Sequence, residues 1–92
     1  MGTNNLWREI HILNKRANGL ITEWVRVRAR RPTTAVERTR IAKHAQELLR
    51  WVETDLQLLA HEDRMSDRDI LEAINTLYEL HERLKRVINE VY

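Results

Sequence analysis

The chain has 92 residues and a net charge of only +2, with no cysteine, two glycines and one proline. We expect residues 1–92 to form one domain, and the lack of cysteine excludes a disulfide framework and thiolate metal sites. No apolar run approaches the roughly 18 residues of a membrane span. Because the start also lacks the pattern of a signal peptide, we expect a soluble, cytoplasmic protein.

The first predicted element is a helix over residues 5–29. Pro32 ends it, because the residue before a proline avoids the helical region. Asn18-Gly19 is a potential break, and residues 25–30 alternate like a strand. We expect one continuous helix, since the helical spacing of the apolar residues passes Gly19 without a shift. The predicted core face comprises Leu6, Ile10, Leu13, Ala17, Leu20, Trp24 and Val27.

The second predicted helix covers residues 34–61, and Thr34 with Glu37 forms a capping box at its start. About 130° from the centre of the core face, three residues form a line at seven-residue spacing near or outside the rim of the core. Large exposed apolar side chains on such a line indicate a partner helix or a homodimer. This candidate protein interface comprises His44, Trp51 and Leu58, the core face comprises Ala42, Ala45, Leu49, Val52, Leu56 and Leu59, and Ile41 and Leu48 lie on one flank.

The third predicted helix covers residues 66–91. Ser66 with Asp69 forms a second, weaker capping box, and Met65 with Ile70 has the spacing of a hydrophobic staple. Two adjacent apolar lines cover about 160° of this helix, which suits packing against two neighbours. The first line comprises Ile70, Ala73, Leu77, Leu80, Leu84, Val87 and Val91, and the second comprises Leu71, Ile74, Tyr78, His81, Lys85, Ile88 and Tyr92.

Three long helices with heptad-like apolar spacing predict an all-α fold, an up-down-up three-helix bundle. In that topology the C-terminus of the third helix lies beside the connection between the first two. Both regions are rich in arginine, whereas the acidic residues around Asp67 and Glu72 fall at the opposite end. The bundle should therefore have one basic and one acidic end.

The positive charge is concentrated around Pro32: residues 26–43 carry a net charge of +6 and the rest of the chain −4. Cations in the last turn of a helix are stabilised by its dipole by roughly 0.3–1 kcal/mol each. Arg38 and Arg40 follow the start of a helix, where the dipole offers them nothing, so folding leaves them unexplained. The predicted polyanion-binding residues are Arg26, Arg28, Arg30, Arg31, Arg38, Arg40, Lys43, Arg83, Lys85 and Arg86.

These charges predict a non-enzymatic binding module whose arginine-rich end engages a polyanion, first of all the backbone of a nucleic acid, in a regulatory or assembly role. No helix-turn-helix, zinc-finger or aromatic sheet motif accompanies them, so contacts would go to phosphates and weaken steeply with salt. Trp24 lies on the predicted core face, so we expect it to pack there and not to stack on bases.

Two alternatives remain open. The first is an inhibitor, adaptor or oligomerisation domain that docks through the apolar line of the second helix, with the arginines steering it to an acidic protein surface. The second, more distant, is a ribonuclease, because the spacing of Arg38 and His44 resembles the Arg-x5-His motif of HEPN-type ribonucleases. His44 and Glu47 share one helical face, but no second pair at ligand spacing accompanies them, so we expect no metal site. We also expect no cofactor and no small-molecule substrate.

Overall fold

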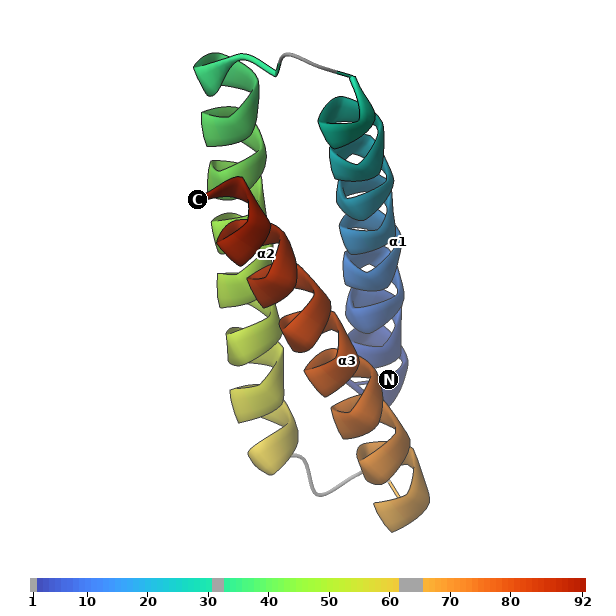
Figure 1. Ribbon diagram of the computed structural model, residues 1–92. Coiled ribbons are helices and arrows are strands. Elements are labelled where there is room, and N and C mark those ends of the chain that lie inside the picture. Colours follow the sequence, from blue (N-terminus) through green and yellow to red (C-terminus); the bar gives the residue numbers. More distant parts are fainter. Residues whose placement is uncertain (1, 31–32, 62–65) are drawn as a thin grey trace.

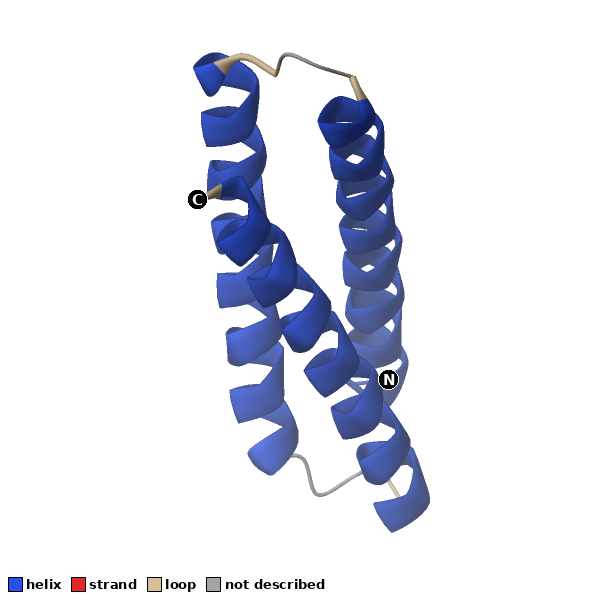
Figure 2. Ribbon diagram, in the orientation of Figure 1, coloured by secondary structure: helices blue, strands red, loops and turns tan. Residues whose placement is uncertain are grey.

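The computed structural model describes residues 2–30, 33–61 and 66–92, which form three helices and, within those ranges, no strand (Figures 1 and 2). Helix α1 spans Gly2–Ala29, α2 spans Ala35–Ala60 and α3 spans Asp67–Val91. They run up, down and up in a rod of 49 × 17 × 17 Å, with α3 lying across α1 and α2 in Figure 1. The predicted all-α three-helix bundle is confirmed.

Helix α1 continues through Gly19 without interruption, as its apolar spacing predicts. All seven residues of its predicted core face are buried, Trp24 included. At Gly19, an added Cβ would meet no atom within 4 Å. The glycine is therefore not required for packing, and the helix tolerates it because the core contacts on either side hold both halves in line.

Replacing Gly19 with alanine should raise the free energy of unfolding by about 0.5–1 kcal/mol, because alanine loses less backbone entropy in a helix. Urea denaturation followed by circular dichroism measures this gain. Gln46→Ala is a suitable control, since Gln46 is exposed in α2 and already a good helix former. A Gly19→Ala protein no more stable than the parent would contradict an unstrained helix with free space at this position.

Helix α2 buries a wider face than its predicted core line. Ala42, Ala45, Val52 and Leu59 are buried as expected, but Leu49 and Leu56 are only half-buried. The line placed on the flank is fully buried instead, at Ile41, Leu48 and Asp55. Helix α2 packs against both α1 and α3. Its buried face therefore includes residues of both adjacent lines, and its centre lies between them.

In α3, the first apolar line is buried from Ala73 to Val91, and Ile70 at its start is half-buried. The second line divides: Ile74, His81 and Ile88 are half-buried, whereas Leu71, Tyr78, Lys85 and Tyr92 are exposed. The core thus occupies a narrower part of α3 than the 160° that its apolar residues cover.

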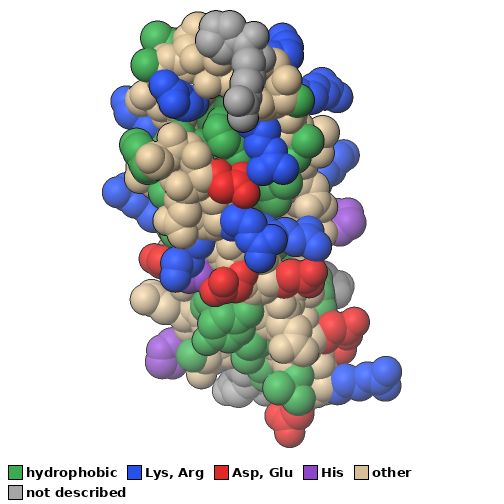
Figure 3. Space-filling model, in the orientation of Figure 1, with side chains coloured by type: hydrophobic (Ala, Val, Ile, Leu, Met, Phe, Trp, Pro, Cys, Tyr) green, Lys and Arg blue, Asp and Glu red, His purple; other side chains and the backbone are tan. Residues whose placement is uncertain are grey.

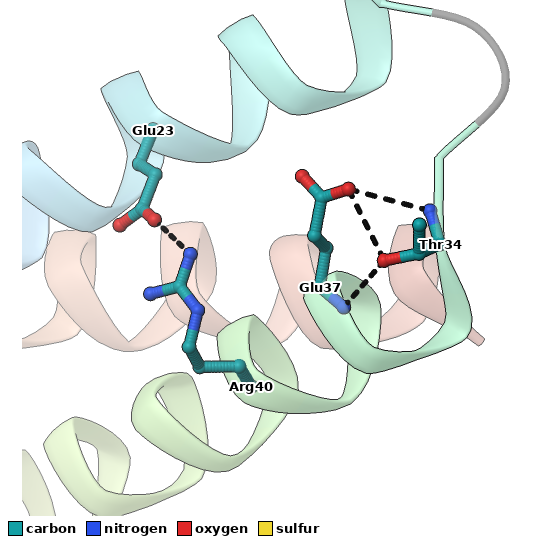
Figure 4. Close-up of polar contacts among 4 residues, drawn as sticks. All are labelled: Glu23, Thr34, Glu37 and Arg40. Carbon is teal, nitrogen blue, oxygen red and sulfur yellow. Dashed lines mark hydrogen bonds and ion pairs between the residues drawn. The ribbon is translucent and has the colours of Figure 1, made fainter.

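Both helix starts confirm the predicted caps. The Thr34 hydroxyl accepts a hydrogen bond from the Glu37 backbone N–H at 3.1 Å, and the Glu37 carboxylate accepts from the Thr34 backbone N–H at 3.5 Å (Figure 4). At α3, the Ser66 hydroxyl accepts from the Asp69 backbone N–H at 3.2 Å. Among the described residues, the Asp69 side chain does not accept a hydrogen bond from the Ser66 backbone in return, so this cap is half of a capping box. Pro32 and the Met65 half of the predicted staple lie outside them.

Candidate binding surfaces

A carboxylate of α3 ties the last turns of α1 and α3 together. Glu90 Oε2 accepts a hydrogen bond from Trp24 Nε1 at 2.7 Å and another from Arg28 Nη1 at 2.9 Å. The indole hydrogen bond, followed by the positive charge of Arg28, lowers the pKa of Glu90. Arg28 also lies in the last turn of α1, where the helix dipole favours a cation. Arg28 therefore stabilises the fold in two ways, through its ion pair with Glu90 and through the dipole of α1.

A second ion pair joins α1 to the beginning of α2. Arg40 Nη2 donates to Glu23 Oε1 across the two helices (Figure 4), and this hydrogen bond raises the pKa of Arg40 above its ordinary value. The expectation that folding gives Arg40 nothing is wrong. Its partner lies 17 residues earlier in the chain, and only the packing of α1 on α2 brings the two side chains together.

Arg83, in the C-terminal part of α3, is paired within the fold. Its guanidinium pairs with Glu79 one turn earlier at 2.9 Å and donates to Asn18 Oδ1 on α1 at 3.3 Å. At 1.5 Å of rise per residue, Arg83 is roughly 12 Å short of Val91 along α3. Arg83 therefore differs from Lys85 and Arg86, which follow it on α3, in having a carboxylate partner within the fold.

Six of the predicted polyanion-binding residues keep their charges exposed. None of them has a carboxylate oxygen within 4 Å among the described residues, and Arg31 lies outside that set. In Figure 3, blue basic side chains are scattered over the upper and middle parts of the face, among green and tan atoms. We call these six residues the basic surface: Arg26, Arg30, Arg38, Lys43, Lys85 and Arg86.

An open groove of 630 Å³ separates the last turns of α1 from the first turns of α2. Arg26 and Arg30 line its α1 side, one helical turn apart, and the paired Arg40 lines its α2 side. Glu23 and Glu37 also reach this groove, but the first pairs with Arg40 and the second completes the cap of α2. Arg26 and Arg30 are therefore the cations there that remain available to a ligand.

The candidate protein interface on α2 is exposed, as its position on the helix predicts. Trp51 is 60% exposed and Leu58 is 51% exposed, and His44 is exposed with them. Trp51 lines a second, largely apolar groove of 110 Å³ between α1 and α2. We call this the apolar groove, and its lining residues are Glu9, Ile12, Leu13, Arg16, Leu48, Trp51 and Asp55. The sequence pattern did not assign Glu9, Ile12, Arg16 or Asp55 to any site.

Asp55 is a buried carboxyl group in the wall of the apolar groove. Only 3% of the residue is exposed, and among the described residues no hydrogen bond acts on its carboxyl group. Burial, with repulsion from Glu9 as a second cause, raises its pKa to about 6. The burial of Asp55 could have been predicted from the sequence, because Asp55 continues the line of Ile41 and Leu48 at seven-residue spacing.

The histidines form no cluster in the described part of the chain. His11, His44 and His61 are exposed, and the half-buried His81 places Nε2 at 3.6 Å from a carboxylate oxygen of Glu53. No group of three or more His, Asp or Glu side chains among these described residues is arranged to hold a metal ion. Arg38 and His44 point about 120° apart around α2, because six residues advance a helix by about 600°.

No known protein family, curated protein or solved structure matches this chain. None of the described helices combines the length and the apolar character needed to cross a bilayer. The function is therefore inferred from the geometry and charge of the two surfaces.

Proposed function

We propose that the protein is a non-enzymatic module that binds a polyanion, in the first place the phosphate backbone of a nucleic acid, in a regulatory or assembly role. The supporting observation is the division among its basic residues. Arg28, Arg40 and Arg83 have carboxylate partners within the fold, whereas the six residues of the basic surface have none among the described residues. Unpaired like charges repel one another, and a polyanion would remove that repulsion.

The placement of these cations suits a phosphate backbone. Arg26 and Arg30, the latter directly after the last residue of α1, lie together at the open groove, while Arg38 and Lys43 add charge along α2. A guanidinium can bind a phosphate through two parallel hydrogen bonds, so the arginines offer both charge and orientation. Because contacts to a phosphate backbone carry no sequence information directly, affinity should vary little with sequence.

Binding should weaken steeply with salt. If about four to six phosphates are neutralised on a duplex, affinity should fall roughly 10²–10³-fold between about 50 and 200 mM salt. Fluorescence anisotropy of a labelled mixed-sequence duplex measures this slope, with single-stranded DNA and RNA of equal length as further ligands. No binding at low salt would contradict the proposal, and RNA cleavage that a His44→Ala variant abolishes would favour a ribonuclease instead.

The decisive variant is Arg26→Glu/Arg30→Glu/Arg38→Glu, which should lose at least about a hundredfold in affinity at low salt. A matched control makes the same change in net charge at three exposed cations elsewhere, Arg8, Lys15 and Arg50. The control should retain most of the affinity, because screening limits charges more than about 10 Å away. Equal losses in both variants would show that net charge alone, and not the basic surface, drives binding.

A second candidate function is protein binding through the apolar line of α2, favoured by the exposure of Trp51 and Leu58. The basic surface would then steer the module to an acidic protein. Replacing Trp51 and Leu58 with serine separates the two functions. The polyanion proposal requires each chain of this variant to keep binding the duplex, whereas a protein-binding function requires the variant to lose its partner.

A further inference from the structure

Three exposed residues of α1 follow one another along the apolar groove: Glu9, Ile12 and Arg16. Glu9 and Arg16 are seven residues apart, so they share a face of the helix and lie roughly 10 Å apart along its axis. Ile12, which is 44% exposed, falls near the midpoint between them. On this helix the groove thus has an acidic end, an apolar middle and a basic end.

Helix α2 provides a matching series on the other side of the groove. Trp51 lines the groove opposite Ile12. Along α2, His44 lies two turns before Trp51 and Leu58 two turns after it. Asp55 lies at the Glu9 end, close enough for the charge of Glu9 to raise its pKa. The acidic end therefore carries two carboxyl groups, one from each helix, and Trp51 marks the centre of the α2 series.

We propose that the apolar groove is the interface of an antiparallel homodimer, with its two-fold axis passing near Ile12 and Trp51. A two-fold rotation about that axis brings Arg16 of each copy to Glu9 and Asp55 of the other. The same rotation brings Leu58 of each copy to His44 of the other. The surface is thus complementary to itself in charge, as the commonest dimer symmetry requires.

The alternative parallel arrangement lacks this complementarity. A two-fold axis parallel to the groove would bring the Glu9 and Asp55 end of one copy against the same acidic end of the other, and like charges facing each other disfavour association. In the antiparallel arrangement the exposed Trp51 and Ile12 cover each other at the centre, where interfaces concentrate aromatic side chains. Asp55 also gains a cation that the described part of its own chain does not supply.

Sedimentation equilibrium over a concentration series tests the dimer directly, since one chain has a mass of 11.1 kDa. The parent should approach twice this mass at high concentration, and Trp51→Ser should dissociate it. Arg16→Glu should raise the dissociation constant about tenfold or more, because the introduced carboxylate would then face the two carboxyl groups of the other copy. Lys15→Glu is the matched control and should leave the mass unchanged, since Lys15 does not line the groove.

The double variant Glu9→Arg/Arg16→Glu tests the orientation. It exchanges the charges between the two ends, so an antiparallel dimer should recover most of the loss caused by Arg16→Glu alone. A parent that stays monomeric throughout, an Arg16→Glu protein that dimerises as the parent does, or a double variant no better than the single one would each overturn the proposal. Circular dichroism checks that these exposed substitutions leave the helices intact.

Discussion

Replacing Asp55 with asparagine should raise the free energy of unfolding by roughly 2–3 kcal/mol near pH 7.5 and leave it almost unchanged near pH 4. The cause is the burial of an ionisable group whose pKa in the folded protein is about 6, against an ordinary value of 3.8. At neutral pH the folded protein must either hold a buried carboxylate or take up a proton. Asparagine has nearly the same shape and never ionises, so it avoids that cost.

The direction of the pH effect follows from proton counts. Between about pH 4 and pH 6 the folded parent binds more protons at Asp55 than the unfolded chain, so its stability falls as pH rises through this window. Above this window the contribution of Asp55 to the free energy of unfolding no longer changes with pH. Carboxylates whose pKa is lowered by folding have the opposite effect, because their contribution to stability grows as pH rises, and Glu90 is one of them. The useful quantity is therefore the difference in stability between variant and parent at each pH.

Chemical denaturation of dilute protein at a series of pH values measures that difference. Glu47→Gln is a matched control, because Glu47 is an exposed carboxylate of the same helix. It should change stability by no more than about 0.5 kcal/mol at any pH. A gain in Asp55→Asn that is equal near pH 4 and pH 7.5 would show that hydrogen bonding or packing, and not charge, determines the effect.

Replacing Leu77 with alanine should lower the free energy of unfolding by about 2–5 kcal/mol. Leu77 lies in the middle of α3, is 0% exposed and belongs to the core shared by all three helices. The substitution removes apolar contacts and leaves a cavity that long, regular helices cannot close easily. For a domain of this size such a loss is a large part of its total stability.

The matched control makes the same change on the second apolar line of the same helix. Leu71 is 62% exposed, so Leu71→Ala should cost less than about 1 kcal/mol. Urea denaturation gives both values under identical conditions. Similar costs at the two positions would mean that Leu71 is covered in solution, either by a partner or by a different rotation of α3.

Periodicity predicted the core of α1 and most of that of α3 because each helix has one dominant apolar line. For α2 it identified the helix but misjudged the centre of its buried face. The residues of two adjacent lines are all apolar up to Asp55, so sequence alone did not show that Ile41 and Leu48 are buried more deeply than Leu49 and Leu56. The depth to which each residue of α2 is buried depends on where α1 and α3 lie around it.

For a related reason, the predicted polyanion-binding residues include three arginines that pair within the fold, Arg28, Arg40 and Arg83. Counting charges along the chain finds the concentration of arginines, but it misses partners from distant segments. Glu23 and Glu90 approach Arg40 and Arg28 across helices, and their approach depends on the rotation of each helix, which apolar spacing fixes only coarsely. The apolar groove was missed because its charged residues lie on two helices and acquire a common location only on folding.

The order of the helices also bears on how quickly the chain can fold. Each helix packs on its neighbour in sequence across a connection of a few residues, so α1 with α2 and α2 with α3 can associate without closing a long loop. Only the contacts between α1 and α3 must wait for distant segments to meet. Domains dominated by such local pairing fold in microseconds to milliseconds, which limits the time that their apolar faces are open to aggregation.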